Sequence, residues 1–154
     1  MDYKQSLIKK LKDYNLTISI AESCTGGKLS SFFVAQEGAS SFFSGGVIAY
    51  SPKSKVDLLK IDSKKIDDYG VVSKEIANEM SVSVKNLFNT NISISTTGNA
   101  GPSSVNSNEP VGKIFIAINY MGKVEVEECH FKGDRNGNII LAVDKALFLL
   151  NNIL

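Results

Sequence analysis

Apolar residues follow two alternating patterns along the chain, one with the period of an α-helix and one with the period of a β-strand. Residues 4–14 place apolar side chains at helical spacing opposite a row of lysines, which predicts an amphipathic helix. Residues 16–21 alternate apolar with small polar side chains, as a strand does. Helical spacing returns over residues 29–33, and the β-prone run at 45–50 predicts another strand. Pro52 is expected to end that strand, because proline donates no hydrogen bond to a ladder.

The second half of the chain repeats these patterns and adds a hairpin. A short helix is predicted over residues 53–61, and Ser73 reads as the N-cap of a longer helix. A strand is predicted from Asn91 to Thr96, and two more form a hairpin within residues 112–131. Asp134 is expected to cap a C-terminal helix.

Helices that alternate with strands early, followed by a late hairpin, predict an α/β fold. We expect one three-layer domain over residues 1–154, in which helices cover a mixed β-sheet. The chain has 154 residues with 43% hydrophobic side chains, enough for one packed core. Its polar N-terminus shows no signal-peptide core and no apolar run is long enough to span a membrane, so we expect a cytoplasmic protein without a membrane partner.

Charge and rare residues restrict the possible chemistry. Seventeen basic and sixteen acidic residues nearly cancel, which argues against a nucleic-acid partner. Arg135 is the only arginine and His130 the only histidine, so a three-histidine metal site is excluded and a Ser-His-Asp triad would have to use His130. Cys24 and Cys129 are too few for a disulfide framework.

The first candidate site is Ala21-Glu22-Ser23-Cys24-Thr25-Gly26-Gly27, where a strand passes into a helix. Backbone N–H groups at such a turn favour anions, and the glycines allow a ligand close to the main chain. Ser23, Cys24 and Thr25 offer nucleophile or hydrogen-bond chemistry. An ordinary capped helix start explains the pattern equally well, and Cys24 fits a small buried residue better than a nucleophile.

Three further segments could carry chemistry. Ser40, Tyr50 and Lys55 would form a histidine-free route to acyl transfer if burial lowers the pKa of the lysine, although turn serines and a solvated lysine fit the same pattern. Residues 95–102 place small side chains at the end of a strand, where open α/β sheets often bind ligands. A loop without a binding role explains this pattern nearly as well. Arg135 could bind an anion or form a surface ion pair.

Six motifs in this order resemble the CinA C-terminal domain family over nearly the whole chain. They are Ala21-Glu22-Ser23-Cys24-Thr25-Gly26-Gly27, Tyr50-Ser51 with Lys55, Tyr69-Gly70-Val71-Val72-Ser73, Thr97-Gly98-Asn99-Ala100-Gly101-Pro102, Pro110-Val111-Gly112, and Phe131-Lys132-Gly133-Asp134-Arg135.

The resemblance implies an amidohydrolase of the pyridine nucleotide cycle. Stand-alone members include nicotinamide mononucleotide deamidases, which form nicotinate mononucleotide and ammonia without a metal or other cofactor, and members are typically homo-oligomers. The serine, tyrosine and lysine of the family site carry over as Ser40, Tyr50 and Lys55, with Ser23 beside them. The sequence does not decide which serine attacks. The contiguous grouping favours Ser40, with Tyr50 relaying its proton to Lys55 and Ser23 orienting the amide or its oxyanion.

The resemblance also suggests where a nucleotide would bind. The expected substrate-binding residues belong to the two glycine-containing motifs and the C-terminal one: Thr25, Gly26, Gly27, Thr97, Gly98, Ala100, Gly101 and Arg135. Some positions depart from the family pattern, including Asn99, the run Ser103-Ser104-Val105, and Ile139-Ile140 where relatives carry a second arginine. These changes concern the expected nucleotide pocket more than the reaction type, and they would fit an alternative function, a nucleotide-binding module of the same family that senses or regulates without catalysis.

Overall fold

A five-stranded sheet forms the middle layer of the computed structural model, which describes residues 1–104 and 109–154. The strands are β1 (Ile18–Glu22), β2 (Phe43–Ile48), β3 (Ile92–Gly98), β4 (Lys113–Tyr120) and β5 (Lys123–His130). Their order across the sheet is β2-β1-β3-β4-β5. β1 pairs in parallel with both β2 and β3, whereas β3, β4 and β5 pair antiparallel. The predicted mixed sheet and late hairpin are therefore confirmed.

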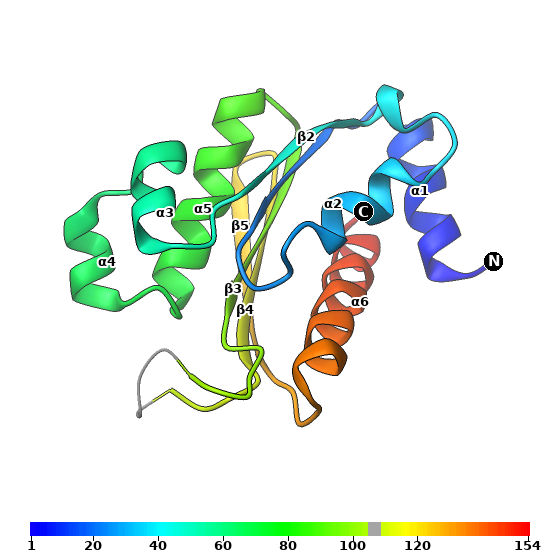
Figure 1. Cartoon of the computed structure of the whole chain (residues 1–154). Helices are drawn as coiled ribbons and strands as arrows, with labels where there is room; N and C mark the ends of the chain where they lie inside the picture. The colour runs from blue at the N-terminus through cyan, green and yellow to red at the C-terminus, as the bar shows by residue number, and fades with distance from the viewer. Residues whose placement is uncertain (105–108) are drawn as a thin grey trace.

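Helices cover both faces of this sheet (Figure 1). One outer layer contains α1 (Tyr3–Asp13), α2 (Lys28–Val34) and α6 (Arg135–Ile153). The other contains α5 (Lys74–Phe88), against which α3 (Pro52–Leu59) and α4 (Ser63–Tyr69) pack. A 3₁₀ turn (Ala39–Ser41) precedes β2. The described part of the chain is thus the predicted three-layer α/β domain.

The two faces of the sheet are built from different side chains. Isoleucines such as Ile18, Ile94 and Ile116 point toward α1 and α6 and form the larger core. In β1 and β3 the intervening positions toward α5 carry small residues, and their serine hydroxyls bond to carbonyl oxygens of α5. Ser93 Oγ donates to Ser81 O at 2.6 Å, and Ser95 Oγ donates to Ala77 O at 2.5 Å. Small side chains let α5 approach closely, and its carbonyls satisfy the buried hydroxyls.

Most predicted element boundaries agree with the structure. The two predicted caps are confirmed, because Ser73 Oγ accepts from Ile76 N at 3.2 Å and Asp134 Oδ1 accepts from Gly137 N at 2.8 Å. The prediction for Pro52 was wrong: β2 has already ended, and this proline is the first residue of α3. Proline fits there because the first helical N–H has no intrahelical partner. α4 was not predicted, since Ile66 and Tyr69 are its only apolar side chains and they give no clear helical period.

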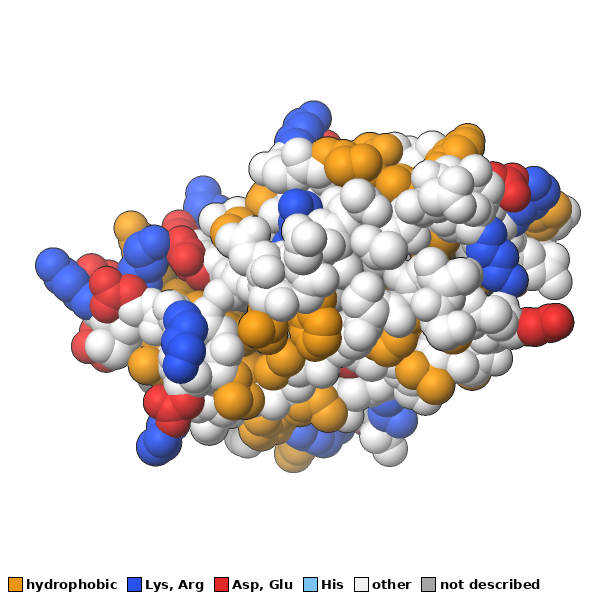
Figure 2. All heavy atoms as spheres, turned by 90° about the horizontal axis from the view of Figure 1, so that it is seen from above, with side chains coloured by type: hydrophobic (Ala, Val, Ile, Leu, Met, Phe, Trp, Pro, Cys, Tyr) orange, Lys and Arg blue, Asp and Glu red, His pale blue; other side chains and the backbone are white. Residues whose placement is uncertain are grey.

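Charged side chains of both signs are interspersed on the surface. Figure 2 shows them gathered toward the two ends of one face, with a largely uncharged middle. Several form ion pairs of opposite sign, such as Lys65 with Glu79 and Lys4 with Asp144. Among the described residues, no helix has the length and hydropathy needed to cross a membrane.

The parallel strands bring three candidate segments to one edge of the sheet. Ser23 directly follows β1, Tyr50 lies two residues beyond β2, and Thr97 and Gly98 end β3. Because the carboxyl ends of neighbouring parallel strands lie at the same edge, loops far apart in sequence meet there.

Candidate active site

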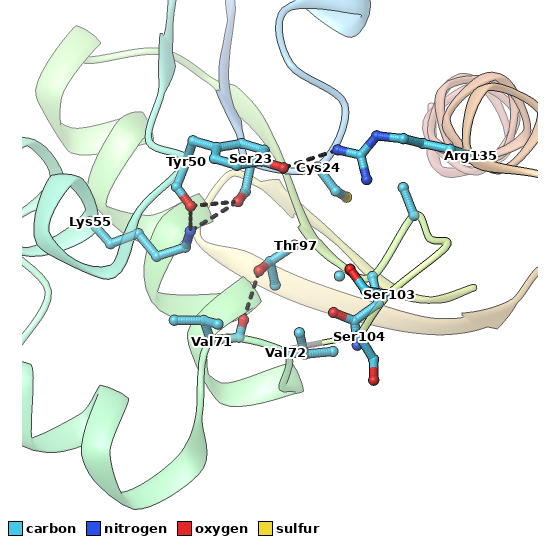
Figure 3. Close-up of a pocket in the computed structure, with 13 residues that line it drawn as sticks. Ser23, Cys24, Tyr50, Lys55, Val71, Val72, Thr97, Ser103, Ser104 and Arg135 are labelled. Atoms are coloured by element: carbon cyan, nitrogen blue, oxygen red, sulfur yellow. Dashed lines mark hydrogen bonds between the residues drawn. The ribbon is translucent and has the colours of Figure 1, made fainter. Parts of the chain in front are cut away.

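A serine and a lysine are in side-chain contact at this edge (Figure 3). Lys55 Nζ lies 2.9 Å from Ser23 Oγ. The same Nζ lies 2.8 Å from Ala49 O and 3.1 Å from Tyr50 O. Lys55 belongs to the first turn of α3, which begins with a capping box between Ser51 and Ser54. This turn directs the lysine side chain inward to the end of β1.

The hydrogen-bond partners of Lys55 determine where its lone pair points when the amine is neutral. A neutral amine has two N–H groups and one lone pair, whereas carbonyl oxygens only accept. If the two N–H groups donate to the Ala49 and Tyr50 carbonyls, the lone pair is left for the Ser23 hydroxyl. The geometry therefore suits Lys55 to accept a proton from Ser23 Oγ.

Burial disfavours the charged form of this amine and so raises its neutral fraction. Lys55 is only 1% exposed, and desolvation lowers its pKa to about 8. Among the described residues, no carboxylate forms an ion pair with it that would favour the charged form. Serine–lysine pairs of this kind act as nucleophile and base on several unrelated folds.

Cys24 is close to this pair but is chemically different. Burial raises the pKa of its thiol to about 12, so the thiol is protonated near neutral pH. Because the thiolate is the nucleophilic form, this environment disfavours a cysteine mechanism. Cys24 instead contributes to the wall of the cavity.

A cavity of about 210 Å³ opens beside Ser23 and Lys55. It is lined by residues from five segments of the chain. The lining residues are Ser23, Cys24, Tyr50, Lys55, Val71, Val72, Thr97, Gly98, Asn99, Ala100, Ser103, Ser104 and Arg135. Four of the predicted binding residues are therefore at the cavity, namely Thr97, Gly98, Ala100 and Arg135.

Two residues of the cavity wall were not predicted as part of a site. Val71 and Val72 lie in the loop before α5, and apolar residues in a loop give no chemical signal of their own. Thr97 positions this loop, because its Oγ1 donates to Val71 O at 2.6 Å. Val105, part of the run that departs from the family pattern, lies outside the described residues.

The glycine turn before α2 does not contribute the anion site that the sequence suggested. Within the described part of the chain, the cavity lining does not include Thr25, Gly26 or Gly27. The first-turn amides of α2 are already bonded, since Glu22 accepts from Leu29 N at 2.9 Å and from Ser30 N at 3.0 Å. An internal carboxylate therefore occupies the position where a ligand anion was expected.

Ser40 does not join Tyr50 and Lys55. It is exposed in the 3₁₀ turn before β2, whereas Tyr50 and Lys55 follow the other end of that strand. β2 has six residues, and an extended strand rises by about 3.3 Å per residue, so it separates them by about 20 Å. The expected convergence of Ser40 and Ser23 on one pocket is wrong, because sequence proximity was mistaken for proximity across a strand.

Tyr50 also differs from the predicted proton relay. Its backbone carbonyl contacts Lys55, while its hydroxyl accepts from Arg135 Nη2 at 3.0 Å. Arg135 Nη1 donates in turn to Gly101 O at 2.6 Å. The arginine thus links the segment after β2 to the segment after β3 at the rim of the cavity, as Figure 3 shows for Tyr50.

The fold and site define a class of protein: a three-layer α/β domain with a buried serine–lysine pair at the carboxyl edge of a mixed sheet. Residues 1–154 match the CinA C-terminal domain, and the chain belongs to this family.

Relatives of known sequence and structure agree with this assignment. A competence-damage inducible protein of Clostridium beijerinckii is 38% identical over 154 residues, which is 100% of this chain and 38% of the relative. A CinA-like protein of Flavobacterium psychrophilum is 42% identical over 92% of this chain and 34% of its own length. The chain therefore spans little more than a third of these relatives.

Solved structures share the whole fold. A CinA superfamily protein from Escherichia coli superposes with a TM-score of 0.96 at 30% identity, covering 99% of this chain and 88% of that one. Competence damage-inducible protein A from Klebsiella pneumoniae gives a TM-score of 0.95 at 29% identity, covering 97% and 93% respectively.

Proposed function

We propose that this domain is an amidohydrolase that converts nicotinamide mononucleotide to nicotinate mononucleotide and ammonia. Ser23 would be the nucleophile and Lys55 the general base. The observation that carries the proposal is the 2.9 Å contact between Lys55 Nζ and Ser23 Oγ in a buried setting that lowers the pKa of the lysine to about 8.

The first half of the reaction forms an acyl-enzyme. Neutral Lys55 takes the proton of the Ser23 hydroxyl as Oγ attacks the carboxamide carbon. The positively charged pyridinium ring withdraws electrons from this carbon and makes it more electrophilic. Lys55 then passes the proton to the amide nitrogen, the C–N bond breaks, and ammonia leaves.

The second half regenerates the enzyme. Lys55, neutral again, takes a proton from water, which attacks the ester on Ser23. The tetrahedral intermediate collapses, Ser23 Oγ recovers the proton from Lys55, and the product leaves as a carboxylate after its acidic proton passes to solvent. No step uses the Tyr50 hydroxyl, which is bonded to Arg135.

The choice of substrate rests on the family and on the rim of the cavity. Arg135 is the only arginine of the chain and lines the cavity, and a guanidinium suits a phosphate because it can donate two parallel hydrogen bonds. We assign the 5′-phosphate to Arg135. The Tyr50 and Gly101 contacts of the guanidinium hold it at the rim.

Ammonia release from nicotinamide mononucleotide tests the proposal and separates it from a binding-only role. We expect the wild-type chain to release ammonia and Ser23→Ala to lose the acyl-enzyme completely. Ser40→Ala is the matched control and should react like the wild type, because Ser40 is exposed and remote. Acid quench followed by peptide mapping locates the added mass. Mass on the peptide with Ser40 or on Cys24 would overturn the assignment, and binding without ammonia would favour the regulatory alternative.

A further inference from the structure

Glu22 is a fully buried carboxylate at the end of β1 that takes no part in the proposed chemistry. Both oxygens of this carboxylate accept hydrogen bonds. Thr25 Oγ1 donates to Oε1 at 2.6 Å, and Leu29 N donates to the same oxygen at 2.9 Å. Ser30 donates to Oε2 through its backbone N at 3.0 Å and its Oγ at 2.7 Å. The carboxylate thereby ties the end of β1 to the start of α2 and closes the loop 23–27 between them.

The hydroxyls beside Glu22 have only one consistent direction of donation. An ionised carboxylate only accepts hydrogen bonds, so the Thr25 hydroxyl donates its single hydrogen to Glu22. In the 2.8 Å contact between Thr25 Oγ1 and Thr96 Oγ1, the donor must then be Thr96. Thr96 Oγ1 is left to accept from Ser23 N at 3.4 Å, in addition to the 3.1 Å bond from Ser23 N to Thr96 O.

This series of hydrogen bonds ends at Ser23, whose hydroxyl contacts Lys55 Nζ. The Ser23 amide is fixed on Thr96 of the neighbouring strand, so the backbone that carries the Ser23 hydroxyl cannot rotate freely. All members are buried, with Thr25 at 1% and Thr96 at 0% exposed. Buried hydrogen bonds of this kind are stronger than exposed ones and hold a geometry more tightly.

We propose that Glu22 and Thr25 are positioning residues for Ser23: the carboxylate orients the Thr25 and Thr96 hydroxyls, and this chain holds Ser23 Oγ at Lys55 Nζ. The inference rests on the proposed role of Ser23 as the nucleophile. It needs no contact between Glu22 or Thr25 and the substrate.

Thr25→Val is the test, because valine keeps the shape of threonine and removes only the hydroxyl. Thr90→Val is the matched control. Thr90 is also buried, at 4%, and its hydroxyl also bonds to a second hydroxyl and a carbonyl, but it lies before the opposite end of β3. Thr25→Ser keeps the hydroxyl and should behave like the wild type.

The first readout is the rate at which a fluorophosphonate labels Ser23: the Ser23 Oγ–P bond forms, Lys55 takes the hydroxyl proton, the P–F bond breaks and fluoride leaves. We expect Thr25→Val to lower this rate by about 10- to 100-fold, since a misplacement of about 1 Å can cost that much. The second readout is steady-state hydrolysis, in which kcat should fall by a similar factor while KM is unchanged. Loss of folded protein alone would also lower the apparent kcat at constant KM, so both rates are normalised to the folded fraction measured by circular dichroism, and a purely structural role then changes neither. Thr90→Val should change neither readout by more than about twofold.

The proposal is overturned if Ser23 of Thr25→Val is labelled at the wild-type rate. It is also overturned if Thr25→Val and Thr90→Val are slowed equally. If Thr25→Val does not fold, Thr25→Ala is compared with Thr25→Ser by the same criterion. Failure of both hydroxyl-free variants to fold would assign the hydroxyl to stability alone, which also overturns it.

The labelling readout separates this proposal from the proposed substrate. If the wild type is labelled at Ser23 but releases no ammonia from nicotinamide mononucleotide, only the substrate is wrong, and the labelling rates still decide the positioning role. If the wild type is not labelled at Ser23, the nucleophile assignment fails and the positioning role fails with it.

Discussion

Lys55 illustrates how a single residue can change its chemistry through its surroundings. On a helix surface a lysine is a solvated cation. Here the first turn of α3 places the amine within hydrogen-bond distance of two backbone carbonyls and of the Ser23 hydroxyl. Burial disfavours the charged form, which lowers the pKa of Lys55 to about 8. This burial costs stability as the pH falls below the ordinary lysine pKa of 10.5, in full below about pH 8, and it provides the neutral amine that the proposed base requires.

The pH dependence of hydrolysis should follow the titration of Lys55. Because the neutral amine is the reactive form, kcat/KM should rise about tenfold per pH unit below its pKa and level off above about pH 8. Lys55→Met should remove this limb and lower turnover by about 10²- to 10⁴-fold, the usual contribution of a general base. Stopped-time ammonia assays between pH 6 and pH 9.5 would measure both. A flat profile, or near-wild-type turnover in Lys55→Met, would remove the lysine from its role.

At the scale of elements, the start of α6 is joined to the loop after β3 by one buried amide. Asn138 is 0% exposed, and its Nδ2 donates to Ala100 O at 2.9 Å and to Gly133 O at 3.0 Å. Its Oδ1 accepts from Gly133 N at 2.9 Å. These bonds hold the two segments that carry Arg135 and the small residues of the cavity wall.

Asn138→Ala should therefore destabilise the domain by about 1–3 kcal/mol, the cost of leaving buried polar groups unpaired. Asn136→Ala is the control on the same helix turn, because Asn136 is exposed, and it should stay within about 0.5 kcal/mol of the wild type. Urea unfolding followed by circular dichroism gives both free energies of unfolding. Equal effects of the two substitutions would show that the amide bonds of Asn138 contribute no net stability.

At the scale of the whole molecule, Arg135 brings together three segments that are far apart in sequence. It begins α6, contacts Tyr50 after β2, and donates to the carbonyl of Gly101 after β3. The sheet order β2-β1-β3 and the position of α6 set this arrangement. The rim of the cavity is therefore a property of the assembled domain.

Arg135→Ala should raise KM for nicotinamide mononucleotide much more than for the phosphate-free riboside, with kcat little changed. Loss of an interaction made equally in the ground state and the transition state affects KM alone. Lys132→Ala removes a nearby exposed cation that does not line the cavity, and it should change neither KM. Initial rates on the two substrates test this, and an equal change on both would leave Arg135 as a structural link only.

The sequence by itself determined most of the elements and the class of fold. Apolar spacing placed the strands and the long helices, and the caps at Ser73 and Asp134 were read from residue type, because these signals depend on neighbours within a few positions. The motif residues Ser23, Tyr50, Lys55, Thr97 and Arg135 were also recognisable before the structure.

Only the tertiary structure decided which of these residues meet. Ser40 is near Tyr50 in sequence but is separated from it by β2, whereas Ser23, 32 positions from Lys55, touches its amine. A glutamate at the end of a buried strand could have indicated a buried carboxylate at Glu22. Its hydrogen-bond partners in α2 could not be predicted from sequence spacing. Local periodicity reports which face of an element is buried, while the distance between side chains on different elements depends on strand order and pairing.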